Sequence, residues 1–478
     1  MSRAEHSKFL ARFLSEADLA SFISEAADTF STIAKQYENH ALAPLPSLTE
    51  VKSRLNRFNF TDPVDVSEVL SWTATQLCSL DFRLSDPHYF GVFNPNPSAM
   101  GIVGDLYASA RNSQLASAVS SPFGVLVEDH LIRFFGEKLR LNGGTSGGVF
   151  TSGGTEANYT AVLSALAERF PEFEQEGVRG LPASPRIYVS TETHHSFLKA
   201  AKMAGLGLGA VVEVPVTAEL KLDCSKLEQQ IAADKRAGLI PFLIVGTLGS
   251  TSAGVVDDLA AIANVAKRHR AWFHVDAAWG GAACLLPECA DLFSGCESAD
   301  SLTLDAHKWL NVPMTAGMFF CRRERALEKA FRVIPSPYMP KDSEDVAPPY
   351  HRSLGWSRRF TGLKLFMSLA AAGVTGFQQT LRHQIKMGDE LRELLKKGGW
   401  KIENETRLPV VCFSDPHHDA ATLSKRIAAT GKTWVTTTQL TSTGKTVLRA
   451  GISNAITQPE HLATLVELLH SARESAKA

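Results

Sequence analysis

The pattern of apolar and polar positions divides the chain into three regions. Residues 4–38 and 65–80 carry apolar side chains at helical spacing with charges between them, which predicts amphipathic helices. From about residue 147, short apolar runs rich in β-branched residues alternate with helical stretches. The predicted strands are 148–151, 186–190, 210–215, 242–247, 272–276, 301–305 and 316–321, with helices at 155–169, 195–204 and 259–269. We therefore expect an N-terminal helical segment (1–90) and a large α/β domain (91–365).

The remaining region, 366–478, predicts a smaller α+β domain. A long helical stretch runs to about residue 397, and strand-like pieces follow at 409–413, 434–439 and 447–453, with helices near 418–430 and 459–470. In the large domain, strands that alternate with helices require crossover connections, which predict a mostly parallel sheet covered on both faces. Ligands of such sheets bind beyond the carboxyl ends of the strands. Reactive side chains occur at those ends: Thr247, Asp276, His307 and Lys308.

Composition narrows the class of partner. The 478 residues are 44% hydrophobic and 21% charged with a net charge of −1, and no basic run favours nucleic acid or an anionic membrane. No stretch approaches the roughly 20 continuous apolar residues of a membrane span. Acidic residues in the first thirty positions leave no apolar signal core, so we expect a cytoplasmic protein. The seven cysteines have no zinc-site spacing, so we expect reduced thiols and no metal.

Lys308 and Asp276 each follow a predicted buried strand. A lysine and a carboxylate presented from adjacent strand ends suit pyridoxal phosphate (PLP), because the amine attaches covalently to the aldehyde and the carboxylate keeps the pyridine nitrogen protonated. A lone lysine after a strand is ordinarily surface charge. Burial beside Trp309 and Leu310 would instead lower its pKa and make it nucleophilic.

Two further features accompany this pair. Gly153 and Gly154 precede a predicted helix that Thr155 can cap, so backbone N–H groups and the helix N-terminus could bind a phosphate. The alternative is an ordinary strand-to-helix turn. His194 follows the next strand and could lie flat against a pyridine ring, whereas a polar helix start is the alternative for it and for His195.

These markers together resemble the PLP-dependent group II amino-acid decarboxylases, which include aromatic-amino-acid, glutamate, cysteine-sulfinate and diaminobutyrate enzymes. The resemblance extends from about residue 80 to the C-terminus. Five motifs carry it in order: Ser152-Gly153-Gly154-Thr155-Glu156-Ala157, His194-His195-Ser196, Thr247-Leu248-Gly249-Ser250-Thr251, His274-Val275-Asp276-Ala277-Ala278-Trp279-Gly280-Gly281 and Asp305-Ala306-His307-Lys308-Trp309. It implies a fold-type-I PLP-dependent transferase fold of the aspartate-aminotransferase type and a homodimer with shared active sites.

The resemblance also implies residue roles. Lys308 would attach the cofactor, Asp276 would pair with the pyridine nitrogen, and His194 and Ala278 would lie on opposite faces of the ring. Thr247 would contact the ring hydroxyl or its neighbours. The phosphate-side positions are Gly153, Gly154, Thr155, Asp305 and His307, with Asp305 standing where some members have Asn.

The expected reaction is decarboxylation of an L-amino acid to an amine and carbon dioxide. A general acid must then protonate the α carbon, and family members commonly use a tyrosine on a mobile loop. The segment between residues 334 and 358 has the composition of such a loop, and Tyr350 is the candidate. If neither Tyr350 nor His351 reaches the α carbon, oxidation to an aldehyde is the alternative. A catalytically silent PLP-fold protein is a more remote one.

Substrate choice depends on the loop 88–95 and on Arg449. Phe90 and Phe93 suit an apolar or aromatic side chain, whereas Asn94 could bind a polar one. The loop has no additional Arg or Lys for an acidic substrate, which favours aromatic substrates slightly over small polar or acidic ones. Arg449 matches an arginine near the substrate carboxylate in relatives, and a structural salt bridge is its alternative.

Overall fold

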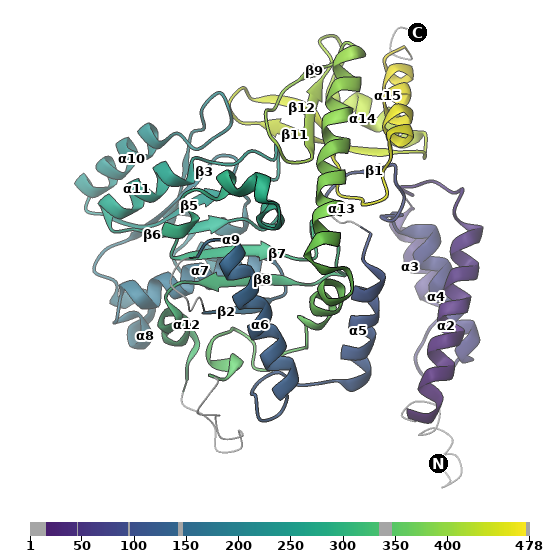
Figure 1. Ribbon diagram of the computed structural model, residues 1–478, viewed down its shortest axis with the longest axis horizontal. Helices are drawn as coiled ribbons and strands as arrows, with labels where there is room; N and C mark the ends of the chain where they lie inside the picture. The colour runs from purple at the N-terminus through teal and green to yellow at the C-terminus, as the bar shows by residue number, and fades with distance from the viewer. Residues whose placement is uncertain (1–15, 45, 94–95, 142–146, 334–346, 475–478) are drawn as a thin grey trace.

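A seven-stranded sheet forms the centre of the large domain in the computed structural model, which describes residues 16–44, 46–93, 96–141, 147–333 and 347–474 (Figure 1). The strand order is β2-β8-β7-β6-β5-β3-β4. Strands β4, β3, β5, β6 and β7 are parallel, and β8 pairs antiparallel with β7 and β2. The predicted mostly parallel sheet is therefore confirmed. The strands are β2 (Gly147–Thr151), β3 (Pro185–Ser190), β4 (Val211–Val214), β5 (Ile240–Thr247), β6 (Trp272–Asp276), β7 (Ser301–Asp305) and β8 (Gly317–Cys321).

Helices cover both faces of this sheet and bury a separate hydrophobic cluster on each. One face carries α7 (Gly154–Arg169), α9 (Ser196–Met203) and α12 (Glu324–Phe331), with the short α8 (Phe173–Glu176) nearby. The other carries α6 (Pro122–Lys138), α10 (Cys224–Arg236) and α11 (Leu259–His269). Helix α7 presents Ala157, Ala161 and Ala165 at four-residue intervals, all fully buried. This stripe of small side chains lets α7 lie close to the strands that carry Asp276 and Asp305.

The smaller domain contains a five-stranded sheet with the order β1-β11-β12-β10-β9. Its strands are β1 (Tyr89–Phe90), β9 (Lys401–Ile402), β10 (Val410–Ser414), β11 (Trp434–Leu440) and β12 (Lys445–Gly451), packed against α14 (Ala420–Ala429) and α15 (Pro459–Glu474). Strand β1 pairs in parallel with β11, so a segment from the N-terminal region completes the C-terminal sheet. The sequence pattern did not predict this strand.

Helix α13 (Leu363–Lys397) joins the two domains, with a break at Gly373, where φ is 63°. Its first part packs against α5 (Ala99–Arg111), and its second part enters the core of the smaller domain. The domain boundary expected at residue 365 therefore falls inside a helix.

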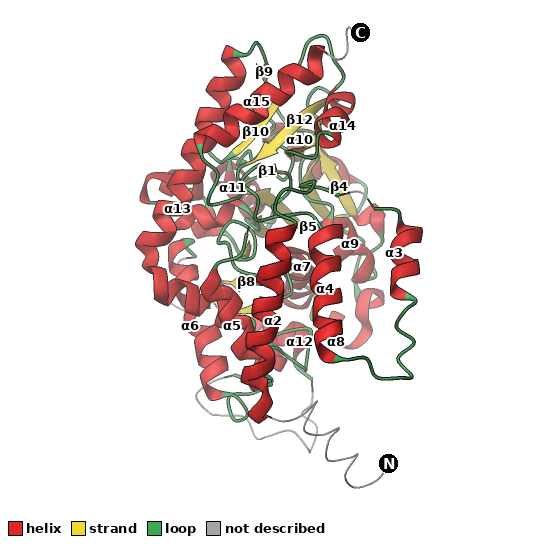
Figure 2. Cartoon of the chain, turned by 90° about the vertical axis from the view of Figure 1, so that its right-hand side faces the viewer, coloured by secondary structure: helices red, strands yellow, loops and turns green. Residues whose placement is uncertain are grey.

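The N-terminal helices α2 (Glu16–Gln36), α3 (Leu48–Leu55) and α4 (Val66–Leu80) lie along one side of the molecule (Figures 1 and 2). Helix α4 begins after Asp65, whose carboxylate accepts a hydrogen bond from the Ser67 amide at 3.0 Å. Apolar side chains on these helices are exposed, including Phe30, Leu48 and Leu77. Among the described residues, no helix is long and apolar enough to cross a membrane.

Candidate active site

A cavity of about 340 Å³ opens beyond the carboxyl ends of β5, β6 and β7. The start of α7 and the turn before α9 complete its wall. All ten residues that the sequence predicts at the cofactor line this cavity: Gly153, Gly154, Thr155, His194, Thr247, Asp276, Ala278, Asp305, His307 and Lys308. The structure therefore brings together, around one space, residues that are widely separated along the chain.

The Lys308 amine lies against a buried carboxylate. Its Nζ is 3.1 Å from Asp305 Oδ2, and the other oxygen, Asp305 Oδ1, is buried without a hydrogen-bond partner among the described residues. His307 Nδ1 accepts a hydrogen bond from the Ala316 amide at 3.0 Å, and burial lowers the pKa of His307. Asp305 is thus positioned to hold the lysine, and the neutral His307 ring can turn Nε2 toward the cavity.

Asp276 ends β6, and both oxygens of its carboxylate receive donors. The Ala278 amide donates to Oδ1 at 3.1 Å, and Asn158 Nδ2 donates to Oδ2 at 2.9 Å. These two donors orient the Asp276 carboxylate.

His194 borders the cavity from the turn that precedes α9. The Ser196 amide donates to His194 Nδ1 at 3.2 Å, which leaves Nε2 to carry the proton of a neutral ring. The ring is exposed because the cavity is open, yet the surrounding protein removes enough water to lower the pKa of His194. An uncharged imidazole suits contact with a flat aromatic ligand.

The two glycines keep the floor of the cavity open. A Cβ on Gly154 would lie 2.9 Å from Asp305 Oδ2 and 3.2 Å from Ala278 Cβ, and one on Gly153 would lie 3.4 Å from His307 Cε1. Helix α7 starts at Gly154, so its free N–H groups and positive dipole end face the same space. The cavity thus combines an anion-binding end, an amine, an oriented carboxylate and a flat imidazole, which fits PLP.

These features together define a PLP-dependent enzyme. The chain belongs to the pyridoxal-dependent decarboxylase family, whose conserved-domain model matches residues 62–415. It is 28% identical to tryptophan decarboxylase 1 of Oryza sativa subsp. japonica over 95% of this chain and 93% of the relative. It is 30% identical to phenylacetaldehyde synthase of Petunia hybrida over 68% and 66%. The crystal structure of Oryza sativa TDC with PLP and tryptamine matches with a TM-score of 0.89 at 27% identity, covering 97% of this chain and 99% of that one.

The substrate-side predictions have mixed placements. Phe90 lies fully buried in the core of the smaller domain and does not line the cavity. Phe93 stacks at 4.3 Å on Trp279, which does line it. Asn94 lies outside the described residues. Tyr350 is buried in a short turn, Pro349–His351, with its ring 4.9 Å from that of Trp356, and it does not line the cavity.

Arg449 is buried against Phe93, whose ring stacks on the cavity residue Trp279. Its Nε donates to the Thr251 carbonyl at 2.8 Å and its Nη1 to the Gly91 carbonyl at 2.9 Å, and the guanidinium lies 4.7 Å from the centre of the Phe93 ring. Nη2 is buried without a partner, and no carboxylate among the described residues pairs with this arginine. The structural salt bridge considered from the sequence is therefore absent from the described part of the chain, and Arg449 itself does not line the cavity.

The sequence reasoning missed several residues of this site. Asn158 lines the cavity and holds Asp276, and Trp279 and Met314 also contribute to the wall. Asn158 lies four residues after Gly154, one helical turn further along the same face of α7. That spacing is the signal that could have identified it.

Proposed function

We propose that the protein decarboxylates an L-amino acid with an aromatic side chain to the corresponding amine and carbon dioxide. The observation that carries this proposal is that one cavity is lined by the Lys308 amine, by His194 and by the Asp276 carboxylate, which accepts a hydrogen bond at each oxygen. When bound, PLP supplies the electron sink for the bond that breaks at the α carbon. Lys308 attaches the cofactor, Asp276 keeps a proton on the pyridine nitrogen, and the His194 ring packs on its face.

The aromatic preference rests on three stacked rings beside the cavity. Phe93 stacks on Trp279, and Trp279 stacks on Trp309 with ring centres 5.3 Å apart. Of the three rings, Trp279 lines the cavity and gives it an apolar aromatic surface that suits an aromatic substrate side chain. A relative from Oryza sativa is a tryptophan decarboxylase, and the structure of Oryza sativa TDC contains tryptamine, which supports the same class of substrate here.

Arg449 is proposed to bind the substrate carboxylate. Its unpartnered Nη2 and the absence of a carboxylate neighbour in the described chain support this role, because a buried guanidinium with a free donor is costly unless an anion completes it. A variant Arg449→Lys keeps the charge and loses the planar fork. It should raise KM for the amino acid while leaving cofactor binding unchanged.

The decisive experiment is a panel of L-amino acids incubated with the PLP-loaded protein and scored for amine, carbon dioxide, aldehyde and peroxide. Amine with stoichiometric carbon dioxide from an aromatic substrate supports the proposal. Lys308→Ala is the control and should lose turnover and the adduct that borohydride traps on the lysine. A wild-type protein that forms no trappable adduct on Lys308 and turns over no substrate would instead be a catalytically silent member of the fold.

Aldehyde formation is the second candidate. Two observations favour keeping it: Tyr350 does not reach the cavity within the described chain, and the chain resembles an aldehyde synthase from Petunia hybrida. If Tyr350 nevertheless supplies the proton to the α carbon, Tyr350→Phe should shift products from amine to aldehyde, ammonia and peroxide. Unchanged amine production by this variant would exclude Tyr350 as the acid.

We further propose a homodimer with shared active sites in the cytoplasm. Apolar side chains are exposed on α2, α3 and α4, on α5 (Ile102 and Tyr107) and on α6 (Phe123 and Leu126). Exposed apolar side chains in this number favour burial against a second copy of the chain. Light scattering on the purified protein should give twice the 51.9 kDa chain mass, and Leu126→Glu should shift the measured mass toward that of the monomer.

The proposed location in the reducing cytoplasm agrees with seven cysteines that are all unpaired. Cell fractionation tests this location.

A further inference from the structure

A chain of buried hydrogen bonds leads from the Asp276 carboxylate, at the end of β6, to Trp272 at the start of the same strand. Asp276 Oδ2 accepts from Asn158 Nδ2 at 2.9 Å, and Asn158 Oδ1 is 3.1 Å from His274 Nε2. His274 Nδ1 lies 2.8 Å from Ser301 Oγ, which accepts from Trp272 Nε1 at 2.8 Å. The strand register produces this alignment, because His274 on β6 lies directly opposite Ser301 on β7.

The direction of every bond follows from one end. A carboxylate can only accept, so Asn158 Nδ2 donates to Asp276 and Asn158 Oδ1 is left to accept from His274 Nε2. A neutral His274 with its proton on Nε2 accepts at Nδ1 from the Ser301 hydroxyl, whose oxygen accepts from the Trp272 indole. Asn158 Oδ1 also accepts from Thr303 Oγ1 at 2.9 Å. If the Asn158 amide were flipped, its NH₂ group would face the two donors Thr303 Oγ1 and His274 Nε2. Its NH₂ group must therefore point to Asp276.

Burial preserves this order. His274 and Ser301 are completely buried and Asn158 is 1% exposed. Burial lowers the pKa of His274 to about 4, so the imidazole stays neutral at neutral pH with one donor and one acceptor nitrogen. A protonated ring would carry N–H groups on both nitrogens, so Nδ1 could no longer accept from the Ser301 hydroxyl.

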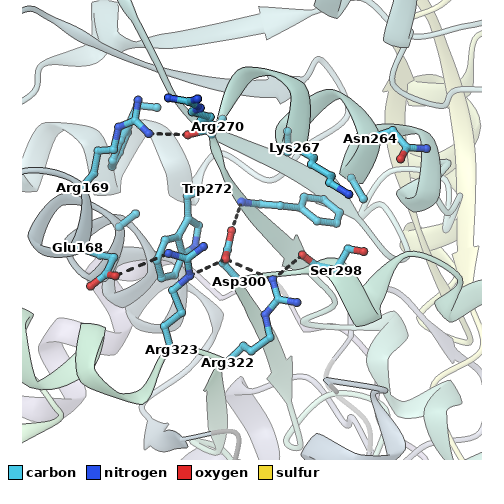
Figure 3. A pocket seen from close by; sticks show the side chains of 16 residues that line it. Glu168, Arg169, Asn264, Lys267, Arg270, Trp272, Ser298, Asp300, Arg322 and Arg323 are labelled. Atoms are coloured by element: carbon cyan, nitrogen blue, oxygen red, sulfur yellow. Dashed lines mark hydrogen bonds and ion pairs between the residues drawn. The ribbon is translucent and has the colours of Figure 1, made fainter. Parts of the chain in front are cut away.

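The end of this hydrogen-bond chain that is remote from Asp276 lies at a separate cleft of about 680 Å³ (Figure 3). Trp272 is in its wall beneath the Arg323 guanidinium, which lies 5.6 Å from the ring centre. Asp300 in turn accepts from Arg323 Nε at 2.9 Å and from the Phe273 amide at 3.0 Å. These contacts fix the start of β6 and therefore the position of the indole N–H.

We propose that Trp272, Ser301, His274 and Asn158 act as positioning residues, forming a directed hydrogen-bond line that orients the Asp276 carboxylate toward the pyridine nitrogen of the cofactor. None of the four except Asn158 lines the cavity. Asn158 Nδ2 also donates to Ser196 Oγ at 2.9 Å, whereas the contribution of the line of four residues reaches the cofactor through Asp276. It should therefore depend on the one ring atom that Asp276 faces.

The test compares two ligands that differ at that atom: PLP and 1-deaza-PLP, in which carbon replaces the pyridine nitrogen. Both are titrated into the full-length protein freed of cofactor, and the ratio of the deaza-PLP Kd to the PLP Kd is measured. In Asn158→Leu this ratio should fall about 10- to 100-fold, the range of one hydrogen bond to a charged group. Ser301→Ala, the milder variant, should lower the ratio in the same direction by a smaller factor.

Ser164→Ala is the matched control. Ser164 is also fully buried, lies on α7 like Asn158, and its hydroxyl has no hydrogen-bond partner among the described residues. This variant should keep the wild-type ratio. If Asn158→Leu and Ser301→Ala weaken both ligands equally, so that the ratio stays constant, the four residues are only structural and the proposal is overturned. A ratio that falls equally in Ser164→Ala overturns it as well.

Discussion

The neutral state of His274 has a measurable consequence for stability. Its folded-state pKa of about 4 lies below the ordinary value of 6.5, because burial removes the water that would stabilise an imidazolium, and the nearby Asp276 carboxylate offsets this only in part. The unfolded chain therefore binds a proton at a pH where the folded protein does not. Since stability rises with pH wherever the unfolded state binds more protons, this histidine costs stability as the pH falls below about 6.5.

The size of the effect follows from the same two values. Each pKa unit corresponds to about 1.4 kcal/mol, so lowering the pH from 7 to 5 should reduce the free energy of unfolding by about 2 kcal/mol through His274 alone. The full loss, approached below pH 4, is about 3.5 kcal/mol. His274→Gln removes the titrating group while its amide nitrogen can still donate toward Asn158. The variant should therefore lack this component of the pH dependence.

Urea unfolding of the cofactor-free protein at pH 7 and pH 5 measures the difference. Wild type should lose about 2 kcal/mol more than His274→Gln between the two pH values. Comparing each protein with itself cancels any constant cost of the substitution. The exposed His130→Gln variant serves as control and should follow wild type. Equal losses in wild type and His274→Gln would refute the assignment of a neutral, buried imidazole at this position.

Three further outcomes are expected. Glu128 is buried and paired with Arg358 at 3.3 Å, so Glu128→Ala should cost roughly 3–5 kcal/mol of unfolding free energy. Asp129 forms an exposed pair on the same helix, so Asp129→Ala should cost less than about 1 kcal/mol. Equal costs of the two substitutions would contradict this. Gly249→Ala should destabilise by roughly 1–3 kcal/mol in thermal unfolding, because φ is +92° and the Cβ would meet an indole carbon at 2.9 Å. PLP should raise Tm by binding only the folded state, and Lys308→Ala should retain less of that shift; a full shift would show that phosphate and ring contacts dominate affinity.

The cofactor side of the site could be predicted because its residues follow local rules. Gly153 and Gly154 stand at a strand-to-helix turn, and Asp276 and Lys308 follow strands whose apolar pattern is plain in the sequence. In a parallel sheet the carboxyl ends of neighbouring strands meet, so order along the chain is enough to bring such residues together. No knowledge of side-chain packing was needed for them.

The substrate side could not be predicted in this way, because long-range packing decides it. Phe90 looked like a pocket residue, yet pairing of β1 with β11 from the far end of the chain buries it in the smaller domain. Tyr350 was chosen from loop composition, whereas contacts with the Ala116 carbonyl and the Trp356 ring fix it in a buried turn. Strand β11 and Ala116 are far along the chain from Phe90 and Tyr350, so no local pattern indicated these contacts.

The hydrogen-bond line that ends at Asp276 was not predicted, although the sequence of β6 and β7 carries a signal for it. Alternate side chains of a strand point to opposite faces, and on β6 the face toward α7 carries Trp272, His274 and Asp276, while Phe273 and Val275 join the hydrophobic cluster on the other side. Strand β7 repeats this arrangement with polar side chains toward α7. A central strand buried on both faces would ordinarily be apolar throughout. Polar residues at every second position therefore indicate that one face is built for hydrogen bonding, and because the row ends at Asp276, the sequence itself contains the evidence that this face serves the active-site carboxylate.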